Sequence, residues 1–145
     1  DNQKISFTLS DLFCVDRHRN SFSELIKDDV DILFGNKEEI CSMIESTSLN
    51  EGIDYAKSLS ATTIITLAEK GSLIVNNNEV IEIPAIVVDK VIDTTGAGDL
   101  FASGFLYGLC QNKDLKTCGH MASVAASEII SHYGARPLTK LSTLI

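Results

Sequence analysis

The chain has no tryptophan, only two prolines, and only twelve basic residues against twenty acidic ones. The formal net charge of -8 argues against non-specific nucleic-acid binding, which depends on clustered lysine and arginine. No apolar run is long enough to cross a bilayer, and no signal-peptide pattern is present. We therefore expect neither a nucleic acid nor a membrane among its partners.

The chain also lacks the spacings that metal sites need. The four cysteines, at positions 14, 41, 110 and 118, include no C-x-x-C pair, and no histidine pattern completes a zinc site. We expect buried or half-buried free thiols in a protein of the reducing cytoplasm. The 145 residues, 44% of them apolar and 22% charged, suffice for a globular domain with a real core.

Strand and helix patterns alternate along the chain, which is typical of an α/β fold. The patterns predict strands at residues 5–10, 30–36, 62–67, 72–75, 79–83 and 86–88. They predict helices after a charged loop at 15–19, from residue 37, and at 48–59, 97–109 and 118–131. We expect parallel strands, helices on both faces of the sheet, and a hairpin towards one edge.

A glycine-rich turn between a predicted strand and a predicted helix is the most informative stretch. Gly96 and Gly98 flank an alanine, and Asp99 follows in the first turn of the helix. Glycine lets the backbone turn sharply, and the first amides of a helix, with the helix dipole, form a seat for an anion. A carboxylate beside a phosphate seat suits a base that accepts the proton of an attacking hydroxyl.

Residues 93–101, DTTGAGDLF, resemble the C-terminal signature of the PfkB (ribokinase-like) carbohydrate and nucleoside kinases. The resemblance implies a three-layer α-β-α fold and transfer of the terminal phosphate of ATP to a hydroxymethyl group. It also implies that the amides of Gly96, Ala97 and Gly98 form an anion hole and that Asp99 is the catalytic base. The alternative is a tight strand-to-helix turn in which Asp99 is only a helix-start charge.

A second motif follows the strand predicted at 30–36. Asn36 and Glu39 match the family's N-x-x-E motif, which positions magnesium, through water at Glu39, and the ATP phosphates. The alternative is a capping box, because the same spacing suits the start of a helix. Arg17, His18 and Arg19 could contact phosphate, but we interpret them as a solvated helix start with Asp16 as its cap or ion partner.

The resemblance also implies nucleotide and cation contacts. Thr66, Leu67 and Gly71 match the family's T-L-G-x-x-G segment beside the nucleotide, and Ser123 falls at its adenine-side polar position. Ala68 replaces the glycine of that segment, and a methyl group is tolerated there if φ is negative.

Asp93 and Thr95 correspond to residues that bind a monovalent cation, such as potassium, in this family. Residues 134–137, GARP, resemble the family's G-A-x-P loop, whose carbonyls can complete that site. The Gly-then-Pro order also predicts that these residues terminate the helix at 118–131.

Several blocks, including 30–36 with Glu39, look like the adenosine kinases, so a nucleoside is the expected small-molecule acceptor. Thr95 is the commoner sugar-kinase form, so a sugar kinase of the ribose, fructose or ketodeoxygluconate type is the alternative. Family members are typically about twice as long, and we expect residues 1–145 to be the C-terminal nucleotide-binding and catalytic part, without the N-terminal half and lid.

Two further alternatives concern the fragment itself. It could be a nucleotide-binding module without catalysis, because most acceptor-binding residues lie in the absent half. It could also be an interaction fragment, because exposed sheet edges and apolar surface favour self-association, with a homodimer as one form.

Overall fold

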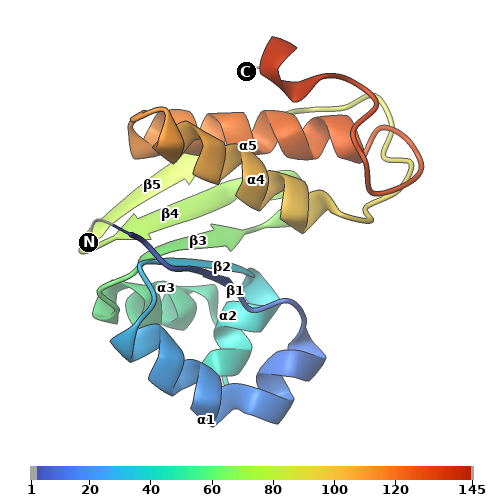
Figure 1. Ribbon diagram of the computed structural model, residues 1–145. Coiled ribbons are helices and arrows are strands. Elements are labelled where there is room, and N and C mark those ends of the chain that lie inside the picture. The colour runs from blue at the N-terminus through green and yellow to red at the C-terminus, as the bar shows by residue number, and fades with distance from the viewer. Residues whose placement is uncertain (1–2, 145) are drawn as a thin grey trace. The chain divides into compact units, whose positions relative to one another are not determined.

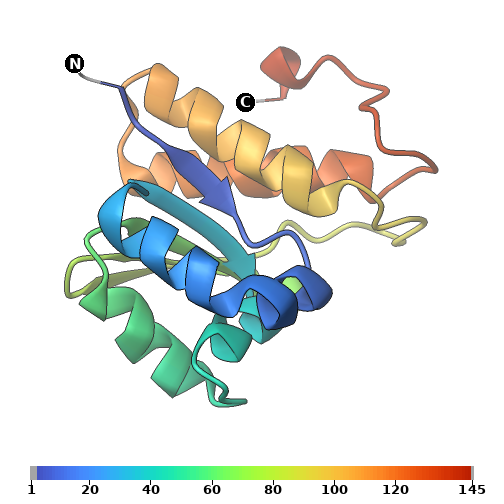
Figure 2. The same ribbon diagram turned by 60° about the horizontal axis from the view of Figure 1, so that its bottom comes forward.

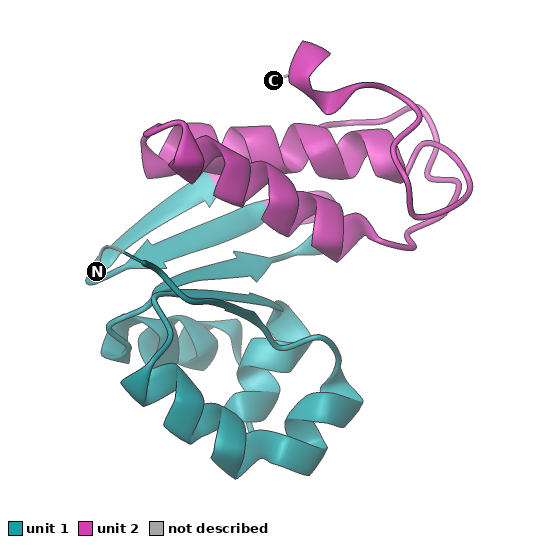
Figure 3. Cartoon of the chain, viewed as in Figure 1, with its two compact units in different colours: residues 1–68, 72–82 teal, residues 69–71, 83–145 magenta. Residues whose placement is uncertain are grey.

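The computed structural model describes residues 3–144, which form two compact units (Figure 3). Unit 1 holds the residues up to 68 together with 72–82, and unit 2 holds residues 69–71 and those from 83 onwards. Among the described residues, no helix has the length and apolar character that a membrane span requires. The four cysteines are all free. Cys41 and Cys118 are buried and Cys14 is half-buried, as predicted, whereas the prediction was wrong for Cys110, which is exposed.

Unit 1 is built on a sheet of strand order β1-β2-β3-β4-β5 (Figure 1). The strands are β1 (Ser6–Thr8), β2 (Ile32–Asn36), β3 (Thr62–Thr66), β4 (Ser72–Asn76) and β5 (Glu79–Ile83). β1, β2 and β3 are parallel, with Ile32 opposite both Ser6 and Thr62, whereas β4 runs antiparallel to β3. β4 and β5 are joined by a two-residue turn in which Asn77 has φ 53°, a torsion that asparagine tolerates.

Three helices cover one face of this sheet, as both views of the ribbon show (Figures 1 and 2). They are α1 (Leu12–Asp28), α2 (Lys37–Met43) and α3 (Leu49–Ser58). Each helix contributes apolar side chains to a core with the strands, and burying each one fully contributes about 1.5–3 kcal/mol. The core includes Leu9, Val15, Ile26, Leu33, Ile40, Met43, Ala56, Ile65 and Val75.

Unit 2 is built on two helices that pack along each other, α4 (Ala97–Cys110) and α5 (Leu115–Ile129). Glycines of α4 allow a close approach, because a Cβ added at Gly104 would lie 2.8 Å from the carbonyl oxygen of Met121. At Gly108, an added Cβ would lie 2.9 Å from the Cys118 sulfur. These two glycines therefore serve the close packing of α4 on α5.

The predicted start of the first helix was wrong. α1 already begins at Leu12, and its N-cap is Asp11, whose Oδ1 accepts a hydrogen bond of 2.7 Å from the amide of Cys14. The charged residues lie inside α1, which has non-helical torsions only at His18 (φ -123°, ψ 18°). Asp16 is therefore no cap, although its predicted role as an ion partner is confirmed by its 2.9 Å pair with Arg19.

The strand predicted at 86–88 was also wrong. Residues 84–95 belong to no helix or strand, and the side chain of Val87 is 94% exposed. A run of β-branched residues needs a partner strand, and none of the described strands pairs with this one. The segment is instead tied to the end of α5 by a 2.8 Å hydrogen bond from the amide of Ile92 to the carbonyl of Ile130.

The bounds of the last helix also differ from the prediction of 118–131. α5 begins at Leu115, because Asp114 caps it by accepting a 2.9 Å hydrogen bond from the amide of Thr117. α5 ends at Ile129, so Gly134, with φ 94°, lies in the following loop and does not terminate the helix. A short 3-10 turn, Leu141–Thr143, closes the described chain.

Candidate active site

The turn that precedes α4 depends on glycine. Gly96 is the N-cap of α4 and has the left-handed torsions φ 80° and ψ 2°. An added Cβ there would also lie 3.0 Å from the Cβ of Ala135, so the turn packs directly on the loop after α5. Both the torsions and this close contact therefore favour glycine at position 96.

The amides of this turn are only partly used by the protein itself. The amide of Ala97 donates a 3.1 Å hydrogen bond to the carbonyl of Thr94, and that of Leu100 donates a 2.9 Å bond to Gly96. The amides of Gly96, Gly98 and Asp99 make no hydrogen bond with other described residues. Free amides at a positively polarised helix start can bind an anion.

The turn is open in front of the predicted base. Asp99 is exposed in the first turn of α4, and a Cβ added at Gly98 would have no heavy atom within 4 Å. A carboxylate in such a position can accept a proton from a bound hydroxyl group. The predicted anion hole and base thus lie side by side at the start of one helix. The amide of Ala97 is already bonded to Thr94, however, and the free amide of Asp99 was not among the predicted donors.

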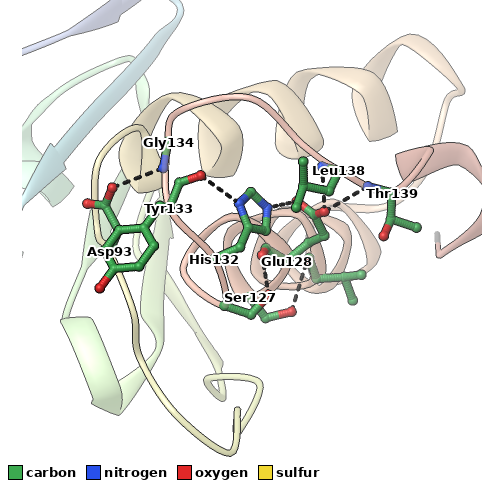
Figure 4. Close-up of polar contacts among 10 residues, drawn as sticks. Asp93, Ser127, Glu128, His132, Tyr133, Gly134, Leu138 and Thr139 are labelled. Carbon is green, nitrogen blue, oxygen red and sulfur yellow. Dashed lines mark hydrogen bonds and ion pairs between the residues drawn. The ribbon is translucent and has the colours of Figure 1, made fainter.

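Asp93 links the turn to the loop after α5 (Figure 4). Its Oδ1 accepts hydrogen bonds from the hydroxyl of Thr95 at 2.6 Å and from its amide at 2.9 Å, and Oδ2 accepts one from the amide of Gly134 at 3.1 Å. These bonds, the hydroxyl of Thr95 foremost, lower the pKa of Asp93 to about 2. Asp93 is therefore charged throughout the physiological pH range.

Asp93 and Thr95, the predicted cation ligands, already use part of their hydrogen-bonding capacity within the protein. A carboxylate can accept about four contacts, and Asp93 already accepts three, so one position is left for a potassium ion. Nowhere in residues 3–144 do three or more His, Cys, Asp or Glu side chains gather in a way that could hold a metal ion. The cation role of Asp93 and Thr95 stays a prediction.

A second hydrogen-bonded carboxylate, which the sequence reasoning missed, lies near the end of α5. The Glu128 side chain is 8% exposed, and its Oε1 accepts 2.8 Å hydrogen bonds from the amides of both Leu138 and Thr139. Its Oε2 lies 3.3 Å from His132 Nε2, and His132 Nδ1 lies 3.2 Å from the carbonyl of Tyr133. The i,i+4 spacing of Glu128 and His132 was the available signal.

These contacts shift the pKa values of Glu128 and His132. Burial alone would raise the pKa of Glu128, but the amide of Thr139, the His132 ring and the amide of Leu138 outweigh burial and lower it. The Tyr133 carbonyl and the Glu128 carboxylate raise the pKa of His132. Each partner therefore favours the charged form of the other.

In unit 1, Asn36 and Glu39 form a complete capping box at the start of α2. Asn36 Oδ1 accepts a 2.8 Å hydrogen bond from the backbone amide of Glu39. In return, the Glu39 carboxylate accepts a 2.9 Å bond from the backbone amide of Asn36 and a 2.8 Å bond from its side-chain nitrogen. Glu39 is 7% exposed, and burial raises its pKa. Because both oxygens have internal donors, a role for Glu39 in magnesium binding fits best through water.

The segment predicted to lie beside the nucleotide has unusual torsions. Gly71 has φ 91°, and an added Cβ would lie 2.0 Å from the carbonyl oxygen of Ile83, so only glycine fits. Ala68 has φ 53°, so the negative φ on which we expected its methyl group to be tolerated is not observed. Thr66 and Leu67 are half-buried and Ser123 is 6% exposed; their nucleotide contacts stay predictions.

Unit 2 also contains an open hollow of about 640 Å³ between residues 86–92 and α5. Glu128 and Thr139 line this hollow, whereas Asp99 and the glycines of the turn do not. The hollow is therefore separate from the predicted anion hole.

Comparison with known proteins shows the family to which the chain belongs. The chain belongs to the pfkB family of carbohydrate kinases, whose family model matches residues 5–141. In sequence, it is 40% identical over 105 residues to a nucleoside kinase of Methanocaldococcus jannaschii, covering 72% of this chain and 34% of that protein. The chain thus spans about a third of the length of this curated relative.

Solved structures give the same assignment. A probable sugar kinase from Rhizobium etli matches with a TM-score of 0.96 at 40% identity, covering 99% of this chain and 44% of that one. An adenosine kinase from Sinorhizobium meliloti matches with a TM-score of 0.95 at 37% identity, covering 98% of this chain and 44% of that one. The predicted family and the α/β ribokinase-like fold class are confirmed.

Proposed function

We propose that this chain is the nucleotide-binding and catalytic part of an ATP-dependent kinase that phosphorylates a primary hydroxyl group of an adenosine-like nucleoside. The observation that supports this most is the exposed carboxylate of Asp99 beside the free amides of Gly96 and Gly98. The neighbouring amide of Asp99 is also free and adds a third donor. The likeness to a nucleoside kinase and an adenosine kinase supports the acceptor class.

In the proposed reaction, the acceptor hydroxyl attacks the γ-phosphorus of ATP in line. The new oxygen–phosphorus bond forms as the bond to the β–γ bridging oxygen breaks, ADP leaves, and Asp99 takes the hydroxyl proton. The free amides stabilise the charge on the phosphoryl oxygens, a contribution of about 3–4 kcal/mol per donor in comparable anion holes. Magnesium, held through water by Glu39 with Asn36 positioning the phosphates, would neutralise charge on the β and γ phosphates.

A sugar acceptor of the ribose, fructose or ketodeoxygluconate type is the second candidate. The Thr95 hydroxyl donates to Asp93 at 2.6 Å, so this side chain is already engaged and does not favour a nucleoside. The likeness to a probable sugar kinase also supports a sugar as the acceptor. We also propose a cytoplasmic location, which suits free thiols and ATP as a substrate, and leave a homodimer as the candidate assembly.

A change of Asp99 to asparagine in a kinase-length protein that includes this chain tests the proposal. We expect turnover with adenosine to fall by about 10²–10⁴-fold, because a positioned general base contributes that much, while ATP–magnesium binding persists in calorimetry. Asp89→Asn, which removes an exposed carboxylate from the segment before the turn, is the matched control and should leave turnover unchanged.

Near-normal turnover of Asp99→Asn would exclude Asp99 as the base. Parallel assays of the unchanged protein with adenosine, ribose, fructose and ketodeoxygluconate decide the acceptor class. If the 145-residue chain binds ATP–magnesium but transfers no phosphate, it is a nucleotide-binding module without catalysis on its own.

A further inference from the structure

The loop after α5 has no apolar anchor of its own. All residues from 133 to 140 are exposed, and the two largest apolar side chains in the segment, Tyr133 and Leu138, are 83% and 77% exposed. A segment that buries no side chain gains little from the hydrophobic effect and is ordered mainly by its hydrogen bonds. The position of this loop therefore depends on the polar groups that hold it.

Glu128 accepts most of the hydrogen bonds that fix this loop (Figure 4). Its carboxylate, on the last full turn of α5, accepts hydrogen bonds from two consecutive loop amides, those of Leu138 and Thr139, at 2.8 Å each. His132 contacts the second carboxylate oxygen at 3.3 Å and the Tyr133 carbonyl at 3.2 Å. The loop is thus fixed at both ends to one buried acid.

Between these two attachment points, the loop contacts the turn that begins α4. The amide of Gly134 donates to Asp93 at 3.1 Å, and Ala135 lies against Gly96 so closely that an added Cβ would come within 3.0 Å. Asp93 in turn holds the amide and hydroxyl of Thr95, the residue before Gly96. A continuous set of contacts therefore runs from Glu128 through the loop to the turn with the free amides.

We propose that Glu128 and His132 are positioning residues for the phosphate-binding turn: they fasten residues 132–139 to α5 and so hold Gly134 and Ala135 against Asp93 and Gly96. The mechanical link rests on the hydrogen bonds, whereas its effect on phosphoryl transfer rests on the proposed function. When the loop is released, Asp93 loses one donor and Gly96 loses the surface that supports its left-handed torsions. The free amides then no longer share one fixed direction.

The experiment compares three variants by amide hydrogen exchange on the 145-residue chain and by kinetics in the kinase-length protein. Glu128→Ala removes the acceptor, whereas Glu128→Gln keeps an oxygen for the two loop amides. Ser127→Ala is the matched control, because Ser127 lines the same hollow but bonds only to the carbonyl of Val124 within α5. Exchange at core positions such as Ala122 reports whether a variant has unfolded.

For Glu128→Ala, we expect exchange at Leu138, Thr139 and Gly134 to accelerate by about tenfold or more, since charge-assisted hydrogen bonds are lost. Exchange at Ala122 should stay unchanged. In the kinase-length protein, kcat should fall by about 10²-fold, the cost of a misplaced catalytic geometry, while KM for the acceptor stays within about twofold. Glu128→Gln should restore most of both properties, and Ser127→Ala should change neither.

Faster exchange at Leu138 and Thr139 with unchanged exchange at Gly134 and unchanged kcat would overturn the proposal. If Glu128→Ala unfolds the chain, Thr139→Pro replaces it, because proline removes one loop donor at an exposed position and leaves the buried carboxylate its other partners. Unchanged exchange at Gly134 in that variant would also overturn the link. If the unaltered protein transfers no phosphate, the proposed function fails, but the exchange at Gly134 still decides the mechanical link.

Discussion

Replacing Gly104 with alanine should push α4 and α5 apart. The added Cβ would lie 2.8 Å from the carbonyl oxygen of Met121 and 2.9 Å from the Cα of Ala122, both of them backbone atoms of α5. Backbone atoms cannot rotate away as a side-chain tip can, so one helix must move. Overpacking of this kind costs about 1–3 kcal/mol.

A comparison within the same helix separates this cost from helix propensity. Alanine favours a helix over glycine by about 1 kcal/mol, a gain that applies at Gly104 and, more weakly, in the first turn at Gly98. An added Cβ at Gly98 meets nothing within 4 Å, so Gly98→Ala has no packing cost. Gly104→Ala carries a packing cost of about 1–3 kcal/mol that Gly98→Ala lacks. The propensity gain is larger at Gly104 by about 0.5 kcal/mol, so Gly104→Ala should be less stable than Gly98→Ala by about 0.5–2.5 kcal/mol.

Thermal unfolding followed by circular dichroism measures this difference. For a chain of 145 residues, 1 kcal/mol corresponds to about 3–4 °C in Tm, so Gly104→Ala should melt about 2–10 °C below Gly98→Ala. Equal melting temperatures for the two variants would refute the close packing of α4 on α5.

Two further predictions concern strain and pH. Ala68→Gly should raise the stability by about 1 kcal/mol, because an alanine at φ 53° is in the left-handed region, and a lower Tm for this variant would contradict that torsion. The pKa of His132 is raised above 6.5, so its contribution is fully present below pH 6.5 and is lost as pH rises through the folded-state pKa. The pKa of Glu128 is lowered below 4.5, so its contribution is present above pH 4.5 and is lost as pH falls through the folded-state pKa. Amide protection at Leu138, corrected for intrinsic exchange, should therefore be greatest between pH 4.5 and 6.5, and a flat profile from acid to alkaline pH would disprove the pairing.

The features that could be predicted from sequence are local in the chain. Asn36 and Glu39 form a capping box because three residues of helix bring them together, whatever the rest of the fold does. The turn at Gly96 and the small residues of α4 are similarly readable, because glycine permits torsions and contacts that other residues exclude.

The features that were missed depend on distant partners. Residues 86–88 have the composition of a strand, but composition cannot supply the neighbour that a strand needs, and Val87 is exposed. Glu128 bonds to amides ten and eleven residues further on, through a loop whose path no periodicity describes. The amide of Ala97 is occupied by Thr94 because of the shape of the turn, which the motif alone does not specify.

The most direct test of the phosphate-binding turn is a titration of the isotopically labelled chain with a non-hydrolysable ATP analogue and magnesium, followed by amide resonances. The free amides of Gly96, Gly98 and Asp99 should shift strongly, and that of Ala97, which already bonds to Thr94, should shift less. Saturable binding of the analogue that leaves Gly96, Gly98 and Asp99 unshifted would contradict the account.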